Sequence, residues 1–595
     1  MAERIAGISR RNFLTGAGIA AAGAAAWGLT GCAPKAKSEI AATEGASATA
    51  TTGTAGFDGT GVLPWLEAEP EIAESAVGET LQADVIIVGL GATGPAAARA
   101  AAEAGAKVLC FEKSATLNSV ASDIAALGGE TQGQWGRGDG FLDKDMIVKR
   151  HMDEGSYHTS FSIIDRWCRE SGSALDWFIG ASKDLYIAPE TWAEIPSDGQ
   201  SNYLAPFFVP MPETYDWTKE DLPCYPTSVT FSNLKKVQED NLQVAVDAGA
   251  EVRYSCPVAK LIVENGMVKG VYAKGAGSDK YIKATASSVV LCTGDYLGNE
   301  AMMKFYEPET VENGVGALCI TFDADGKPTN MGDGHKMAVW AGAAIEQWHA
   351  PMIHHMGGGA GADGRGVMGN NGYLWLNLHG KRFMNEDLPG QQLENQVELQ
   401  PGRVCYQFFD AAWPEQLEYF PAAHGVACIY REDELPAYTA NGLKINVRTP
   451  ADLEAAIADG RCLTSDTIEG LLAQIEGIDV ATAKASIERY NEVCALGVDT
   501  DFGKSPQRLF GLTKAPFYAA KSTTALNLGA LGGAVSDEDC HVFTAEGKKI
   551  EGLYVAGGPQ GGRFAVEYPI SMKGLSMGMC ITFGRIAGQN AAAGK

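Results

Sequence analysis

The amino-acid sequence predicts an α/β fold organised around a parallel sheet, and three neighbouring features predict it. Residues 85–88, VIIV, form an apolar, β-branched run of the kind that is buried on both faces of a parallel sheet. A glycine-rich turn and an alanine-rich helix over residues 95–104 follow directly. A second apolar strand over residues 107–111 completes the unit, because parallel neighbours need a crossover connection between them.

The turn after the first strand, GLGATG over residues 89–94, has the spacing of a dinucleotide-binding loop. Gly89 permits the tight turn, Gly91 lets the backbone approach a pyrophosphate, and Gly94 lets the helix pack closely on the strand. The helix N-terminus then offers free N–H groups to phosphate. Glu112 follows about 20 residues later and is placed to accept hydrogen bonds from a ribose hydroxyl. A glycine-rich turn alone is common, so the flanking strand, helix and acid carry this prediction.

Composition narrows the class of protein. The chain has 595 residues, is 46% apolar and carries a net charge of −26, which argues against nucleic acid or an anionic membrane surface as a partner. Its thirteen cysteines are scattered, without a CxxC or CxxCH motif, so neither a zinc ribbon nor a haem attachment is indicated. We therefore expect electrons for any redox reaction to come from another protein.

Residues 1–32 have the features of an export signal. Arg10 and Arg11 form the twin-arginine pair, and an Ala/Gly-rich apolar stretch follows that is too short to span a membrane. The stretch ends in LTGC, which resembles a lipoprotein processing box with Cys32 as the lipidated residue, although a simple signal with a chance cysteine is the alternative. Residues 33–80 are predicted to be a flexible linker, because the first part is rich in Ala, Thr, Ser and Gly. The protein is therefore expected in the periplasm or at the cell surface.

Two further stretches have a structural and a functional interpretation. Small residues and a glycine pair over residues 122–129 indicate either a loop turn or a second contact with the dinucleotide. Residues 189–226 are rich in Pro, Trp, Tyr and Phe and are consistent with a loop that covers an apolar pocket or with ordinary packing. Tyr203 and Tyr215 in this loop are open candidates for a catalytic acid.

Taken together, the segments resemble the FAD-dependent fumarate reductase and flavocytochrome c flavoprotein family. The matching pieces are GLGATG with Glu112, the Gly128–Gly129 turn, residues 289–294, GDGHKMAVWAGA, GKRFMNE, GLYVAGG and TFGRIAG, and they span residues 84–590. The resemblance implies a Rossmann-like FAD-binding domain in two sequence segments, 81–345 and 529–595, with an inserted α+β capping domain over 346–528. It also implies FAD as the cofactor and a membrane cytochrome or flavin-bearing protein as the external electron donor.

The residues expected to contact FAD combine this resemblance with the glycine-loop argument. They are Gly89, Gly91, Ala92, Thr93, Gly94, Glu112, Lys113, Ser122, Gly128, Gly129, Val258, Thr293, Gly294, Asp333, Gly557, Gly558, Gly574, Leu575 and Ser576.

The sequence departs from the dicarboxylate reductases at three positions. The family's proton-donating arginine falls on Gly390, and its carboxylate-clamping arginine falls on Ser571. The family's carboxylate-binding histidine before a Gly-Gly pair is also missing, since LGAL precedes Gly532. Losing bidentate arginines removes the groups best shaped to hold carboxylates. We therefore expect that fumarate is not the substrate.

The loop before the last helix, EYPISMKGLSMG, instead resembles the ketosteroid dehydrogenase branch of the superfamily. Tyr568 is a candidate acid, and Lys573 is a candidate acid or ligand of the carbonyl oxygen. Ser571 lies between them in the sequence and is a further candidate. The alternative for Tyr568 is a tyrosine of the core, and the alternative for Lys573 is a solvated surface lysine. His349 is a candidate substrate ligand by family position. A metal site is not predicted, because the nearby histidines lack further ligands at suitable spacing.

These features predict an exported FAD-dependent oxidoreductase that reduces a C=C bond conjugated to a carbonyl. An enone or an aryl acrylate suits the altered pocket better than fumarate. The runner-up is a 3-ketosteroid-type dehydrogenase working in the reverse direction. A third hypothesis is a non-catalytic flavin electron carrier, which a substrate-enclosing cap domain disfavours.

Overall fold

The computed structural model describes a large part of the chain in residue detail. The described residues are 63–118, 121–189, 202–206, 215–221, 223–317, 319–323, 325–354, 367–388, 390–421, 449–523 and 526–594. The predicted export signal, Cys32 and the first part of the predicted linker lie outside them. No helix within these ranges is long and apolar enough to cross a membrane.

A six-stranded sheet confirms the predicted α/β class and joins the two ends of the described chain. Its order is β20-β21-β12-β2-β3-β8, and every pair is parallel except β20 with β21. Because β21 pairs with β12, the C-terminal segment completes the sheet that the glycine-loop segment begins. The strands are β2 (Val85–Val88), β3 (Val108–Phe111), β8 (Glu251–Arg253), β12 (Ser288–Leu291), β20 (His541–Phe543) and β21 (Lys549–Val555).

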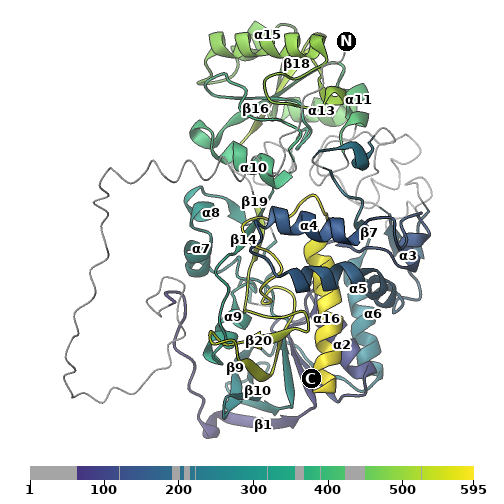
Figure 1. Ribbon diagram of the computed structural model, residues 1–595. Helices are drawn as coiled ribbons and strands as arrows, with labels where there is room; N and C mark the ends of the chain where they lie inside the picture. Colours follow the sequence, from purple (N-terminus) through teal and green to yellow (C-terminus); the bar gives the residue numbers. More distant parts are fainter. Residues whose placement is uncertain are drawn as a thin grey trace, which may run out of the picture. The chain divides into compact units, whose positions relative to one another are not determined.

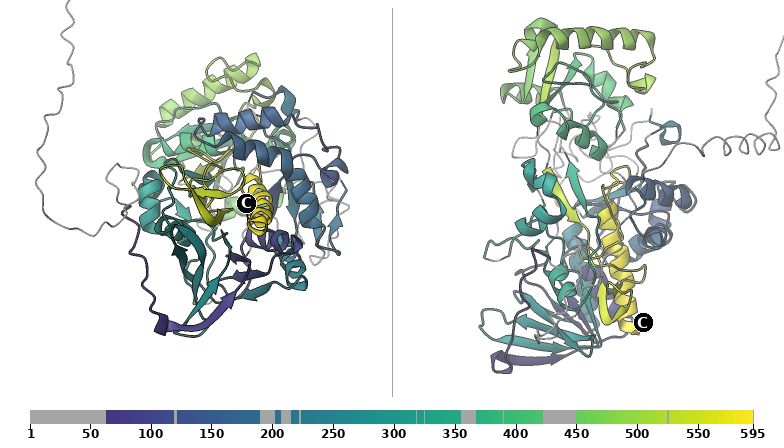
Figure 2. Two further views of the ribbon diagram at one scale, coloured as in Figure 1. Left: turned by 60° about the horizontal axis from the view of Figure 1, so that its bottom comes forward. Right: turned by 60° about the vertical axis from the view of Figure 1, so that its left-hand side comes forward.

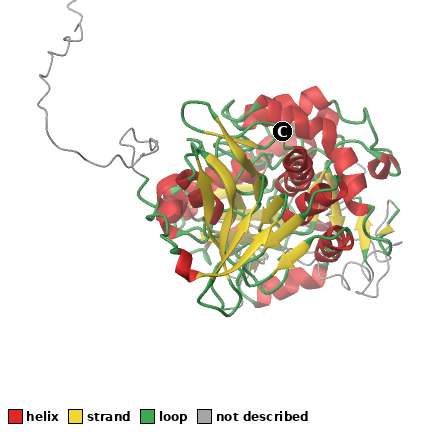
Figure 3. Ribbon diagram, turned by 90° about the horizontal axis from the view of Figure 1, so that it is seen from below, coloured by secondary structure: helices red, strands yellow, loops and turns green. Residues whose placement is uncertain are grey.

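Alternate residues of this sheet enter two different cores, as the period of two along a strand requires. Ile87 and Cys110 pack with helices on one face, whereas Ile86 and Leu109 pack against a second sheet on the other. Figure 3 shows helices, in red, beside the yellow strands. Helices that contribute to the packing around this face are α2 (Gly94–Glu103), α5 (Phe161–Ile179), α6 (Leu234–Asp247) and α16 (Leu575–Ala593).

The second sheet covers the opposite face and includes the end of the predicted linker. Its order is β1-β11-β10-β9, with β1 parallel to β11. Trp65, upstream of β1, is buried and packs with Tyr296 and Met302. The folded body therefore begins before the predicted boundary at residue 81. The strands are β1 (Val77–Gln82), β9 (Val258–Glu264), β10 (Met267–Lys274) and β11 (Tyr281–Thr285).

Helices α2 and α16 lie against each other with little side chain between them (Figure 1). A Cβ atom on Gly584 would lie 2.7 Å from the Thr93 carbonyl oxygen, and one on Gly588 would lie 2.2 Å from that of Ala97. Larger residues would force the helices apart, so these glycines fix their close approach. Since both helices begin at the carboxyl edge of the sheet, their packing positions two helix N-termini beside the same cavity.

Smaller elements surround this frame. A four-stranded sheet has the order β4-β7-β6-β5, and a three-stranded sheet has the order β13-β19-β14. Their strands are β4 (Asp123–Ala125), β5 (Tyr186–Ile187), β6 (Tyr203–Ala205), β7 (Ser228–Phe231), β13 (Gly316–Ala317), β14 (Ala350–His354) and β19 (Leu526–Leu531). The remaining helices here are α3 (Glu130–Gly133), α4 (Lys144–Glu154), α7 (Glu300–Tyr306), α8 (Pro308–Glu312) and α9 (Asp333–Trp340).

The described part of the predicted cap segment contains an antiparallel sheet covered by a helix. The order is β15-β16-β18-β17, and α15 contributes Ile487 and Tyr490 to the core against it. Figure 2 shows a long light-green helix lying beside this sheet. The predicted limits of 346–528 stay a prediction. The strands are β15 (Leu374–Asn377), β16 (Cys405–Asp410), β17 (Cys462–Ser465) and β18 (Phe517–Ser522), and the helices are α10 (Gly390–Glu398), α11 (Trp413–Gln416), α13 (Pro450–Ala458), α14 (Ile468–Leu472) and α15 (Val480–Leu496).

The GKRFMNE segment forms a buried ion-pair network in this region. The Arg382 guanidinium donates from Nε and Nη2 to both Glu386 oxygens at 2.7 Å, and from Nη2 to Asp499 Oδ2 at 2.7 Å. Both carboxylates are fully buried. The arginine therefore pairs with two buried carboxylates, and the Lys504 ammonium, 3.6 Å from Glu386, is a second cation beside them.

Replacing Arg382 by methionine is expected to lower the free energy of unfolding by about 3–5 kcal/mol, because two buried carboxylates lose their partner. Urea denaturation followed by circular dichroism measures this change. The matched control is Lys484→Met, which breaks the exposed pair with Glu469 and should leave the free energy of unfolding close to the parent value. Similar losses in the two variants would contradict a structural role for Arg382.

Candidate functional site

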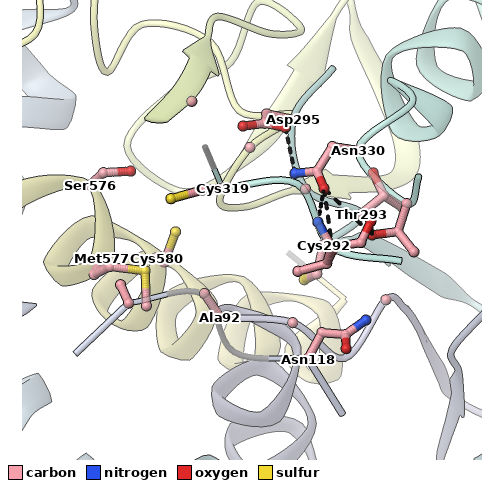
Figure 4. A pocket seen from close by; sticks show the side chains of 18 of the residues that line it. Ala92, Asn118, Cys292, Thr293, Asp295, Cys319, Asn330, Ser576, Met577 and Cys580 are labelled. Atoms are coloured by element: carbon pink, nitrogen blue, oxygen red, sulfur yellow. Dashed lines mark hydrogen bonds between the residues drawn. The ribbon is translucent and has the colours of Figure 1, made fainter. Parts of the chain in front are cut away.

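A cavity of about 670 Å³ lies at the carboxyl ends of the parallel strands. Val88, Phe111 and Cys292 line it at the ends of β2, β3 and just after β12, while Ser576 and Met577 line it from the first turn of α16. Figure 4 shows Ser576, Cys580 and Ala92 around this space, opposite Asp295 and Asn330. Ligands of open α/β sheets bind at this edge, where strand ends and helix N-termini converge.

The glycine loop lines the cavity as the sequence predicts for a dinucleotide site. Gly89 has a φ of +91°, which favours glycine, and a Cβ on Gly94 would lie 2.0 Å from the Gly89 carbonyl oxygen. A Cβ on Gly91 would meet no atom within 4 Å. The backbone of Gly91 is therefore exposed to open space, which suits the close approach of a pyrophosphate.

Buried polar groups at the cavity fit the remainder of an adenine dinucleotide. Glu112 is buried and accepts hydrogen bonds from the backbone N–H groups of Leu90 and Ser114 at 2.7 and 2.8 Å, which fixes its carboxylate at the cavity wall. The Thr293 hydroxyl is buried and has no hydrogen-bond partner among the described residues. A buried hydroxyl without a partner is costly, so a ligand that completes its hydrogen bond is favoured here.

Most of the residues predicted to contact the cofactor lie in the cavity wall, and their roles stay predictions. The lining includes Gly89, Gly91, Ala92, Glu112, Lys113, Ser122, Val258, Thr293, Gly294, Asp333, Gly558, Gly574 and Ser576. It does not include Thr93, Gly94, Gly128, Gly129, Gly557 or Leu575. Several of the latter support the wall: a Cβ on Gly557 would lie 2.2 Å from the Thr93 hydroxyl oxygen, which shows how tightly these segments pack.

The Gly128–Gly129 pair has a packing explanation. Both residues have positive φ, and a Cβ on Gly129 would lie 2.9 Å from the Gly172 carbonyl carbon in α5. Asp176 of the same helix accepts hydrogen bonds from the N–H groups of Glu130 and Thr131. The structure thus places this pair against a helix rather than at the cavity, which favours the structural interpretation of the turn.

Tyr568 and Lys573, two of the predicted catalytic residues, both line the cavity and are buried. The Tyr568 hydroxyl accepts a hydrogen bond from the Ser576 N–H at 3.1 Å, so its own proton points elsewhere. Burial raises the pKa of the Tyr568 phenol well above its usual range, which keeps that proton in place at neutral pH. Tyr568 is therefore available as a hydrogen-bond donor to a ligand.

Ser571 and His349, the other two predicted catalytic residues, lie outside the lining. The Ser571 hydroxyl donates to Glu154 at 2.5 Å, and the Arg150 guanidinium pairs with the same carboxylate. His349 is buried, stacks on Tyr306 with ring centroids 3.7 Å apart, and shares a 2.6 Å hydrogen bond with the Tyr296 hydroxyl. Burial lowers the pKa of His349 well below its usual value, so it is neutral there. Neither side chain reaches the cavity in this structure.

The aromatic-loop candidates are also remote from the lining where they are described. Tyr203 is buried in β6. Tyr215 accepts a hydrogen bond from the Cys224 N–H at 2.7 Å and lines a separate cavity of about 40 Å³. Trp192, Phe207 and Phe208 lie outside the described residues.

Position 390, where the family resemblance places a proton-donating arginine, carries no polar group. Gly390 begins α10, and a Cβ there would lie 3.1 Å from Asn370 Nδ2 and 3.5 Å from Ile570 Cγ1. Ile570 lines the main cavity and the small cavity, so an apolar side chain separates the two. Gly390 itself lines the small cavity, whose wall also includes Glu386, Asp387 and Arg508.

The cavity wall also contains charged residues besides the predicted catalytic pair. Asp123 and Arg563 are buried and line the cavity, and the Arg563 Nη1 atom has no hydrogen-bond partner among the described residues. Asp295 accepts a hydrogen bond from Asn330 Nδ2 at 2.7 Å, as Figure 4 shows, and burial raises its pKa. No sequence motif marks these positions, and the described residues hold no cluster of His, Cys, Asp or Glu suited to a metal ion.

This combination of a parallel sheet, a glycine loop and a long cavity between two helix N-termini defines a flavin-dependent oxidoreductase. The family model described as FAD binding domain matches residues 84–569, and the chain belongs to that family. FAD is accordingly its cofactor, and the chain is a fumarate reductase-like enzyme that acts on carbon–carbon double or single bonds.

Similar proteins point to the same class of reaction. Vinyl phenol reductase of Lactiplantibacillus plantarum is 26% identical over 550 residues, covering 86% of this chain and 96% of that protein. Fumarate reductase (cytochrome) of Shewanella frigidimarina is 24% identical over 552 residues, covering 89% and 78%. The structure of 3-ketosteroid-Δ4-(5α)-dehydrogenase from Rhodococcus jostii has a TM-score of 0.64 at 20% identity, covering 88% and 100%, which shows a shared fold.

Proposed function

We propose that this protein is an exported reductase of a C=C bond conjugated to a carbonyl, with an enone or an aryl acrylate rather than fumarate as its substrate. The observation that carries the proposal is the pair Tyr568 and Lys573 at the wall of the FAD cavity, combined with Gly390 where a proton-donating arginine is expected. A relative named vinyl phenol reductase supports an aromatic or apolar substrate.

The charged groups of the cavity favour a substrate with at most one carboxylate. Lys113 pairs with Asp333 at 2.6 Å and is thereby engaged. Arg563 is the one arginine in the lining of the described cavity, and Lys573, the other lysine of the lining, is the group that we assign to the substrate carbonyl oxygen. A dicarboxylate reductase needs cationic partners at both ends of its substrate, whereas an enone needs none and an aryl acrylate needs one. Met352, Leu528 and Ile570 supply apolar surface for the remainder of such a molecule.

The chain's own residues perform the binding and polarising steps. Tyr568 donates a hydrogen bond from its hydroxyl to the substrate carbonyl oxygen, while the hydrogen bond from the Ser576 N–H holds the phenol in place. Lys573 places a positive group near the same oxygen, which stabilises the enolate-like charge of the transition state. FAD, when bound, would supply the hydride for the β-carbon of the conjugated C=C bond. Burial of these groups excludes water and strengthens each interaction.

Export and electron supply are part of the same proposal. The paired arginines Arg10 and Arg11 and the LTGC sequence at Cys32 support twin-arginine export with a lipid anchor. A membrane cytochrome or flavin-bearing protein would then reduce the FAD outside the cytoplasm. A 3-ketosteroid-type dehydrogenase remains the second candidate, which the fold shared with a ketosteroid dehydrogenase favours.

The test is anaerobic reoxidation of the chemically reduced holoprotein, followed by flavin absorbance. Fumarate, urocanate, a cinnamate, 4-vinylphenol, a 4-ene-3-ketosteroid and a buffer blank are compared in parallel. We expect an enone or aryl acrylate to reoxidise the flavin at least about 10²-fold faster than fumarate, as loss of paired arginine contacts predicts. Rapid reoxidation by fumarate would overturn the proposal. Reduction of the oxidised flavin by a saturated ketosteroid would favour the dehydrogenase, and no response to any compound would favour an electron carrier.

A further inference from the structure

The wall of the FAD cavity contains a buried carboxylic acid, Asp123, that the proposed reaction does not yet use. Asp123 begins β4, is about nine-tenths buried and lines the cavity. Its neighbour across the strand pair is Thr230 of β7, so no second carboxylate lies opposite it. Burying a carboxylic acid costs free energy, and buried ionisable groups at the wall of a ligand cavity are often functional. Asp123 is therefore a candidate for a role in the reaction.

Two hydrogen bonds hold the loop that contains Lys573 onto the segments around Asp123. The Ala125 N–H donates to the Gly574 carbonyl oxygen at 2.8 Å, and the Thr227 hydroxyl donates to the Lys573 carbonyl oxygen at 3.1 Å. A Cβ on Gly574 would lie 2.7 Å from Ala125 N, so only glycine permits this approach. Lys573 and Asp123 are thus fixed on two segments that are bonded to each other.

The groups that face Asp123 act on its proton in opposite directions. Burial raises the pKa of Asp123 to about 6, and the Lys573 ammonium limits that rise. Asp123 in turn contributes to the raised pKa values of Tyr568 and Cys319, which line the same cavity. Strand β7, packed beside β4, carries no ionisable side chain. Asp123 is therefore the acid of this cluster that changes its protonation state near neutral pH.

We propose that Asp123 is a catalytic residue that donates the proton to the substrate carbon, with Lys573 stabilising the carboxylate left behind. This inference rests on the proposed C=C reduction. In the step, the β-carbon receives a hydride from the reduced cofactor, and the π electron pair moves to the α-carbon and carbonyl oxygen. The α-carbon then forms a C–H bond as the Asp123 O–H bond breaks. Asp123 regains its proton from water, and the cofactor is left oxidised by two electrons.

The first test is the pH dependence of substrate-driven flavin reoxidation in Asp123→Asn holoprotein, measured by anaerobic stopped flow. In the parent protein the protonated acid is the active form, so the rate constant should fall about tenfold per pH unit above about pH 6. The variant should be about 10²–10⁴-fold slower and should lose this dependence. The control is Asp139→Asn, an exposed carboxylate outside the lining, which should keep the parent rate and profile.

A second readout separates this inference from the proposed function. Titration of Asp123 beside the bound flavin should shift the oxidised flavin absorbance near pH 6 without any substrate, and Asp123→Asn should abolish that shift. If the shift appears but no compound reoxidises the flavin, the proposed function fails while Asp123 is still an acid at the cofactor. A parent-like rate and pH profile in Asp123→Asn would overturn the role of Asp123.

Discussion

The variant Gly91→Ala is expected to fold like the parent chain and to lose most of its FAD. A Cβ at this position meets no protein atom within 4 Å, so the apoprotein should tolerate it. The methyl group would instead occupy space that the cofactor needs, at a cost of about 1–3 kcal/mol. That cost corresponds to a dissociation constant for FAD that is roughly five- to 150-fold larger. Flavin content of the purified protein, from the ratio of absorbance at visible and ultraviolet wavelengths, measures the loss.

Two further glycine variants make this prediction specific. Gly133→Ala, in α3 and outside the cavity lining, would make only ordinary contact with Gly138 and should retain full flavin content. Gly94→Ala should destabilise the protein itself, because its Cβ would lie 2.0 Å from the Gly89 carbonyl oxygen. Thermal unfolding of the apoproteins distinguishes the cases. Parent-like flavin affinity in Gly91→Ala would mean that the pyrophosphate does not pass this loop.

Replacing Tyr568 by phenylalanine is expected to lower the rate constant for flavin reoxidation by substrate about 10²–10³-fold. The phenol accepts a hydrogen bond from the Ser576 N–H and directs its own proton to a ligand. Phenylalanine keeps the ring and its packing against Phe564 but cannot donate that hydrogen bond. Since burial holds the phenol protonated, the effect should be similar from pH 6 to pH 9.

Tyr554→Phe provides the matched control for this variant. Tyr554 is a buried tyrosine on β21 whose hydroxyl donates to the Asn590 carbonyl oxygen, away from the cavity lining. It should change the reoxidation rate less than about twofold, as expected for a residue with no transition-state contact. If both variants lowered the reoxidation rate equally, the effect of Tyr568→Phe would come from a disturbed structure rather than from a lost hydrogen bond to the substrate. A different pH dependence in Tyr568→Phe and in Asp123→Asn would separate polarisation of the oxygen from protonation of the carbon.

Sequence reasoning located the cofactor site more completely than the catalytic one. The strand β2, the glycine loop and Glu112 are contiguous or at a fixed spacing, so their geometry follows from local rules of strand, turn and helix. The last helix, α16, begins at Leu575, directly after Gly574, which adopts a left-handed conformation. Segments further apart were placed by the resemblance rather than by pattern, and Thr293 and Asp333 do lie in the cavity wall.

Catalytic residues were harder to predict because they meet through tertiary packing. His349 and Ser571 follow family positions, yet one is stacked in an aromatic cluster and the other is bonded to Glu154. Asp123 has no motif of its own, since its significance comes from the bonds that join β4 to the loop of Lys573. The spacing of residues along the sequence does not show whether a carboxyl group is buried. It also does not show how far that group lies from a lysine elsewhere in the chain.

The sequence by itself determined the α/β class, the dinucleotide loop and the loss of the arginines expected at positions 390 and 571, because these depend on residue type and short-range order. Only the tertiary structure decided which side chains face the cavity: Tyr568, Lys573, Asp123 and Arg563 do, whereas His349 does not. The physical reason is that a strand or helix fixes the direction of its own side chains, but the packing of distant segments decides what those side chains meet.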